Sequence, residues 1–132
     1  MNADALTLQR APVAGVWTAQ ADESVFAARF NAAPTGELFA IVCNARNRAL
    51  TLTLHQANAS ATTLRLITAT RTLELPTHGA ALTASIAARA PEHDALITML
   101  GTPGDRFAID AGGAITVLPW TDAIGTTLTA CR

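Results

Sequence analysis

Lysine is absent from this chain of 132 residues, and charged residues of both signs make up only 14% of it. The nine basic residues are all arginines, they are scattered singly, and with ten carboxylates they leave a formal net charge of −1. No block of like charges suggests an interaction tail, and no basic field is present to hold a phosphate backbone. We therefore exclude nucleic acid as a partner.

Long apolar runs are also missing. No stretch approaches the roughly 18 residues that a membrane-spanning helix needs, so we predict no transmembrane segment. The first 15 residues lack a charged region followed by an apolar one, so we predict no signal peptide there. The protein is then either cytoplasmic or the mature form of an exported protein, and an exported protein would be periplasmic or attached to the cell surface.

One domain fits the length and the composition. A chain of 132 residues is long enough to bury a core, and its 50% hydrophobic content excludes disorder. Residues 1–13 show no periodicity and contain Pro12, so we expect a flexible lead-in there. A single globular domain is expected over residues 14–132.

The apolar pattern predicts a mainly β (α+β) fold. A continuous apolar run at 38–43 precedes Leu50, Leu52 and Leu54, which alternate with polar residues, and together they predict a hairpin. In 62–75 the leucines shift from even to odd positions, so one regular strand could not keep them all on one face. This shift predicts a bulge or short turn near Ala69-Thr70. Further strands are expected at 15–19, 24–30, 80–88, 106–110 and 114–118, with loops at 31–36 and 76–79 and a glycine turn at 111–113.

Two short helices are expected near the C-terminus. The first, at 91–100, begins with Pro91, where a missing N–H costs nothing. The second, at 120–131, has Thr121 as its candidate N-cap and Ile124, Leu128 and Cys131 along one face. We predict seven or eight strands in a twisted antiparallel sheet or small sandwich, with these helices covering it.

Two cysteines, Cys43 and Cys131, lie on apolar faces 88 positions apart. They are either two buried free thiols of a cytosolic protein or the halves of one disulfide. Closing such a loop would stabilise the fold by roughly 4.5 kcal/mol in the chain-entropy model, and would indicate an oxidising compartment. Without a CxxC pair or histidines at ligand spacing, we expect no metal site.

His93, between Glu92 and Asp94, is the one candidate for catalysis. An imidazole beside two carboxylates would suit a general base in a small hydrolase, although acidic residues are also common in a first helical turn because of the helix dipole. His55 falls on the polar face of a strand. Gly112-Gly113 lacks the flanks of a phosphate-binding loop, so we expect no cofactor.

A possible binding face combines Thr63, Arg65, Arg71 and Glu74, which are expected on the polar faces of two strands. Such a face would bind a glycan, a peptide or another protein, although threonine- and arginine-bearing faces are more often only solvated. An unpaired edge strand would also allow a homo-oligomer.

The chain over roughly residues 38–132 resembles small uncharacterised exported proteins of alphaproteobacteria, sphingomonads especially. The resemblance depends on short motifs: Cys43, Thr70-Arg71, residues 94–100, Arg106-Phe107-Ala108, Leu118-Pro119-Trp120 and Cys131-Arg132. The chain departs from that pattern after Trp120, where it has Thr121 and Asp122. The resemblance implies an exported, periplasmic or lipoprotein-type location and paired cysteines, and it implies no catalytic residue.

These observations favour a non-catalytic protein of the cell envelope that binds another protein, a peptide or a glycan, as inhibitors, adaptors and assembly factors do. Two alternatives stay open. One is a small hydrolase-like enzyme built on His93 with Glu92 or Asp94, and the other is a structural subunit of a larger envelope assembly.

Overall fold

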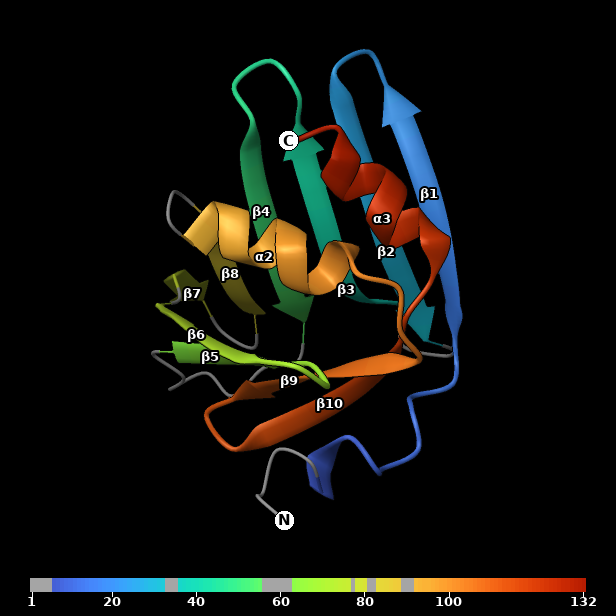
Figure 1. The fold of residues 1–132 in the computed structure, drawn as a ribbon, viewed down its shortest axis with the longest axis vertical. Coiled ribbons are helices and arrows are strands. Elements are labelled where there is room, and N and C mark those ends of the chain that lie inside the picture. Colours follow the sequence, from blue (N-terminus) through green and yellow to red (C-terminus); the bar gives the residue numbers. More distant parts are fainter. Residues whose placement is uncertain (1–5, 33–35, 56–62, 77, 81–82, 89–91) are drawn as a thin grey trace.

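The computed structural model of the chain describes residues 6–32, 36–55, 63–76, 78–80, 83–88 and 92–132. Within them the chain forms ten strands in two antiparallel sheets, with two helices near the C-terminus (Figure 1). The predicted mainly β fold is therefore confirmed. The strands outnumber the expected seven or eight because 62–75 splits into two strands and a short additional strand lies in the predicted loop 76–79.

Sheet A has the strand order β1-β2-β3-β4-β8-β7, in which β1 to β4 form a meander. Its strands are β1 (Val16–Asp22), β2 (Val25–Ala32), β3 (Gly36–Asn44), β4 (Ala49–His55), β7 (His78–Ala80) and β8 (Thr83–Ala88). The alternation of Leu50, Leu52 and Leu54 buries all three on one face, as predicted. Sheet A therefore has one face on the core and one face turned away from it.

Sheet B has the order β10-β9-β5-β6. Its strands are β5 (Thr63–Ile67), β6 (Thr72–Pro76), β9 (Arg106–Ala111) and β10 (Ala114–Pro119). The predicted turn between β5 and β6 is present, since Thr68 N–H donates to Arg71 O at 2.9 Å. Gly112 and Gly113 close the β9–β10 hairpin at φ 63° and 91°, which only glycine adopts without strain.

The core fills the space between the sheets and the helices α2 (Glu92–Gly101) and α3 (Asp122–Thr129). Figure 1 shows both helices in front of one face of sheet A, with sheet B across the end of the layer. Phe30 and Phe39 of sheet A and Phe107 of sheet B are all fully buried there. No helix in the described ranges is long and apolar enough to cross a membrane.

The C-terminal helix is fastened to the sheet by a Cys43–Cys131 disulfide, with the Cα atoms 5.9 Å apart. Ile124, Leu128 and Cys131 form the predicted inward stripe, and each is at most 1% exposed. Thr121 occupies the N-cap position with an extended backbone, but its side chain makes no capping hydrogen bond. The apolar stripe and the disulfide, rather than a capping hydroxyl, therefore hold α3 in place.

The predicted loop at 76–79 was wrong in part. His78 and Gly79 belong to β7, which pairs with β8 through His78↔Ser85 and Gly79↔Ala84. Turn-forming residues predicted a loop there, but pairing with a neighbouring strand overrides such local preferences. The predicted loop at 31–36 is also shorter, because β2 extends to Ala32 and β3 begins at Gly36.

The first described residues pack on the outer face of sheet B. Leu8 lies against a small cluster of Ile67, Ala108 and Val117, all at most 3% exposed. Val13 N–H donates to Val117 O at 2.8 Å, and Arg106 Nη1 donates to Arg10 O at 2.7 Å. Sheet B is consequently covered on part of both faces.

Candidate functional site

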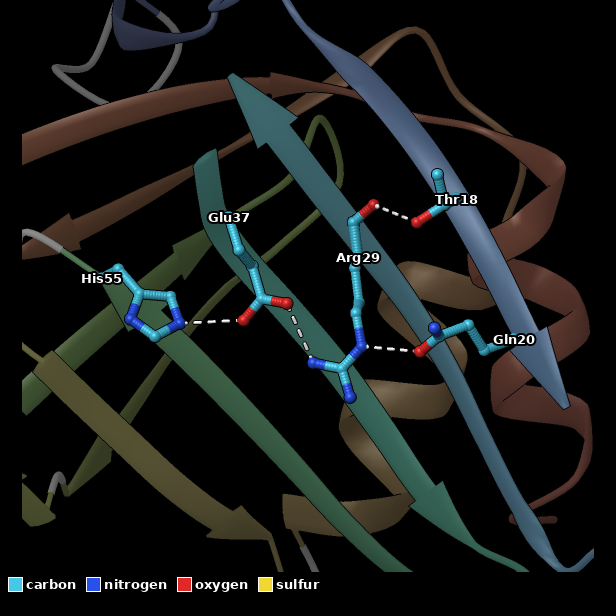
Figure 2. A network of polar contacts seen from close by, with 5 residues as sticks. All are labelled: Thr18, Gln20, Arg29, Glu37 and His55. Atoms are coloured by element: carbon cyan, nitrogen blue, oxygen red, sulfur yellow. Dashed lines mark hydrogen bonds and ion pairs between the residues drawn. The ribbon is translucent and has the colours of Figure 1, made fainter. Parts of the chain in front are cut away.

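The face of sheet A turned away from the helices carries a network of polar side chains (Figure 2). On β2, Ala28 and Phe30 point into the core, so Arg29 between them points outward. On β4, the buried leucines alternate with outward residues, of which His55 is the last. Glu37 of β3 lies between Arg29 and His55 and joins them.

A bulge at Leu38 decides the position of Glu37. In the β2–β3 register, Phe30 pairs with Phe39 but Asn31 pairs with Glu37, so Leu38 is an extra residue without a partner. Leu38 and Phe39 are both buried in the core. Because one inserted residue reverses the alternation, Glu37 points outward although its odd number would otherwise place it with Phe39 and Ile41.

The network is held by contacts between side chains on four strands, β1 to β4. Arg29 Nη1 is 2.9 Å from Glu37 Oε1, and His55 Nε2 is 2.9 Å from Glu37 Oε2. Arg29 Nε donates to Gln20 Oε1 of β1 at 2.8 Å, and Thr18 Oγ1 donates to Arg29 O at 3.5 Å. Each side chain therefore has a fixed orientation on an open sheet face.

The electrostatics of the network favour an ionised Glu37. Partial burial acts to raise the pKa of this carboxyl, but the hydrogen bonds and charges of Arg29 and His55 outweigh it and hold the pKa below its ordinary 4.5. A carboxylate with a lowered pKa is a weak proton acceptor. The geometry therefore suits recognition of polar groups better than proton transfer.

An open hollow of about 510 Å³ adjoins the network. It is lined by Gln20, Ala21, Asp22, Val25, Ala27 and Arg29, all on β1 and β2. Among the described residues, no group of three or more His, Cys, Asp or Glu side chains could hold a metal ion. The hollow thus extends the polar network toward the edge of sheet A.

The binding face predicted from the sequence lies on the other sheet. Thr63 and Arg65 of β5 and Glu74 of β6 are on the outer face of sheet B, where Arg65 pairs in register with Glu74. Arg65 Nη1 is also 3.4 Å from Asp110 Oδ2. Arg71 is in the turn that ends before β6, so it does not lie on a strand face as expected.

The candidate catalytic residues are in the first turn of α2, which begins at Glu92. The side chain of Asp94 is exposed, and those of Glu92 and His93 lie outside the described part of the structure. The hypothesis of a hydrolase-like site at His93 therefore remains a prediction from the sequence.

A second, smaller cavity of about 220 Å³ lies between the N-terminal segment, the β5–β6 turn and the loop after α2. Met99, Leu100, Phe107 and Trp120 give it an apolar lining. The indole Nε1 of Trp120 donates to Leu100 O at 2.7 Å, which orients the ring.

No protein-family model, no curated protein and no solved structure matches this chain. The network is thus described by its own geometry alone. Sequence reasoning placed His55 on a polar strand face but missed Arg29 and Glu37. The alternation in β2 indicated that Arg29 points outward, whereas no sequence pattern indicated the bulge that turns Glu37 toward it.

Proposed function

We propose that this chain is a non-catalytic binding protein of the bacterial cell envelope, and that it holds another protein or a peptide on the outer face of sheet A. The main support for this proposal is the Arg29–Glu37–His55 network, which lies on the face of sheet A that the helices leave uncovered. Fixed donors and acceptors on an open face can pair with a partner's polar groups at little entropic cost.

The shape and the residue types support a macromolecular partner. The network spreads over four strands of a sheet face instead of converging at the bottom of a deep pocket. Protein interfaces are enriched in arginine, whose guanidinium offers several donors in one plane. Arg29 is 34% exposed and retains room to contact a partner.

The proposed location has separate support. The Cys43–Cys131 disulfide is characteristic of oxidising compartments, of which the bacterial periplasm is one. The resemblance of the C-terminal motifs to exported alphaproteobacterial proteins points in the same direction. A periplasmic or surface-attached position is accordingly part of the proposal, and the cytoplasm is the alternative that it replaces.

A capture experiment with matched variants tests the function. Wild type, Arg29→Ala and Arg65→Ala would be immobilised, exposed to an envelope extract and compared by mass spectrometry. A partner purified from the retained fraction would then be titrated by calorimetry. We expect Arg29→Ala to weaken its binding by at least about tenfold, while Arg65→Ala, on the outer face of sheet B, leaves it unchanged.

Two outcomes would contradict the proposal. Equal loss of binding in both arginine variants would move the site away from sheet A. Retention of a polysaccharide in place of a protein would show that the partner class is wrong while leaving the position of the site intact.

A further inference from the structure

Three of the four sheet edges in the described part of the structure are protected against pairing with another strand. Strand β7 has only three residues. Strand β6 carries the exposed Glu74 and ends in Pro76. The edge of β10 is in contact with the chain's own N-terminal segment through the Val13–Val117 hydrogen bond. Short length, charge, proline and covering segments are the usual protections of edge strands.

The fourth edge, β1, lacks such protection. Its seven residues, VWTAQAD, contain no lysine, arginine or proline, and the only charge is Asp22 at the end. Val16 and Val25, on β1 and its neighbour β2, are 67% and 39% exposed and are two of three exposed large hydrophobic residues in the described ranges. Figure 1 shows β1 at the margin of sheet A with no strand beyond it.

The hydrogen-bond alternation identifies which backbone groups of β1 face the free edge. Ala45 N–H donates to Ser24 O, so the even-numbered residues of β2 bond toward β3 and the odd-numbered ones bond toward β1. Thr18 and Gln20, opposite Arg29 and Ala27, therefore bond inward. The N–H and C=O groups of Trp17, Ala19 and Ala21 are directed outward.

We propose that β1 pairs with β1 of a second copy of this chain, antiparallel, about a two-fold axis at Ala19. This register pairs all seven residues of the strand, and it brings the outward backbone groups of Ala19 together. It sets Trp17 opposite the small Ala21 of the partner subunit, and Asp22 opposite an uncharged Val16. A net charge of −1 gives two copies little mutual repulsion.

The dimer makes one continuous sheet from the two copies of sheet A. A two-fold axis perpendicular to the sheet keeps both polar networks on the same outer face, with the two Arg29 positions about 15 Å apart from strand spacings alone. The inference goes beyond the proposed function, since it concerns the number of polar networks that one dimer presents to a partner. A single partner with two matching epitopes would bind both.

Concentration-dependent sedimentation tests the pairing. A seven-residue strand pair buries less area than the roughly 1,200 Å² of a stable interface, so we expect a dimer that dissociates on dilution between about 1 mM and 1 µM. Ala19→Pro removes an outward N–H and leaves the bonds to β2 in place. It should weaken association by at least about tenfold, with the circular dichroism spectrum unchanged.

Cross-linking tests the register. In the proposed pairing, the two Ala19 Cα atoms are about 5.5 Å apart, within the range of a disulfide, whereas the two Thr18 positions exceed 7 Å. Ala19→Cys should therefore give a disulfide-linked dimer under mild oxidation, and the matched Thr18→Cys should not. A wild type that stays monomeric over the whole concentration range, or cross-linking at Thr18→Cys alone, would overturn the proposal.

Discussion

The outer faces of the two sheets differ in what lies on them. Sheet B carries an apolar cluster of Ile67, Ala108 and Val117 on its outer face, and the N-terminal segment packs there through Leu8. Sheet A carries the Arg29–Glu37–His55 network on its outer face, and no described segment covers it. Apolar surface is stabilised by being covered, whereas satisfied polar groups tolerate water. The outer face of sheet A is therefore the one on which we place the proposed binding site.

The largest effect is expected from removing the disulfide that holds α3 against the inner face of sheet A. Cys131→Ser breaks the disulfide to Cys43 and frees the end of α3. The chain-entropy model predicts a loss of roughly 4.5 kcal/mol in the free energy of unfolding, measured by urea denaturation. Wild type with its disulfide reduced serves as the control and should lose a similar amount. A loss below about 1 kcal/mol would show that the apolar stripe alone holds the helix.

The next largest effect is expected where the N-terminal segment packs on the outer face of sheet B. Leu8→Asp places a charge against Ile67, so the N-terminal segment should leave the sheet and the free energy of unfolding should fall by about 2 kcal/mol. Trypsin should then cleave after Arg10 faster than in wild type. Leu6, which is 52% exposed, provides the matched control, and Leu6→Asp should change neither measurement.

A smaller effect is expected in the network on sheet A. Glu37→Gln removes the carboxylate that Arg29 and His55 share, and should cost about 1 kcal/mol of stability at pH 7. Because folding lowers the pKa of Glu37 below 4.5, this contribution is complete above that pH and is lost as the pH falls through the folded-state pKa. The stability difference between wild type and variant should therefore shrink below pH 4.5. Glu74→Gln, on sheet B, controls for the loss of one charge, and an identical pH profile in both variants would contradict the assignment.

The smallest effect is expected for the ion pair on sheet B. Arg65→Ala removes a contact of 3.4 Å to Asp110 from a side chain that is 36% exposed. Partly exposed ion pairs typically contribute about 0.2 to 1 kcal/mol, and many contribute nothing measurable. Thermal melting should therefore change little, and a larger loss would show that sheet B also carries an organised polar site.

Much of the fold could be predicted from local patterns. Alternation placed Leu50, Leu52 and Leu54 in the core, the change of leucine parity located the turn at 68–71, and the stripe of Ile124, Leu128 and Cys131 predicted the inward face of α3. These features depend on residues that are close in the chain, where periodicity is informative.

The site could not be predicted in the same way. Its position depends on strand pairing, which brings Arg29, Glu37 and His55 together from three strands. Residue patterns also predicted a loop at 76–79, where His78 and Gly79 instead pair with β8 as a strand. Pairing between strands decided both cases, and the residue pattern of one strand does not specify which partner and register it takes.

The bulge at Leu38 has a consequence for variation in this strand. It separates β3 into two stretches of opposite phase, because Leu38 adds one residue that β2 does not match. Deleting Leu38 would make Glu37 the direct neighbour of the inward-facing Phe39, and ordinary alternation would then keep the Glu37 carboxylate on the outer face, still opposite Asn31. A one-residue deletion at this position would therefore take a leucine from the core and leave the arrangement of the outer surface of sheet A unchanged.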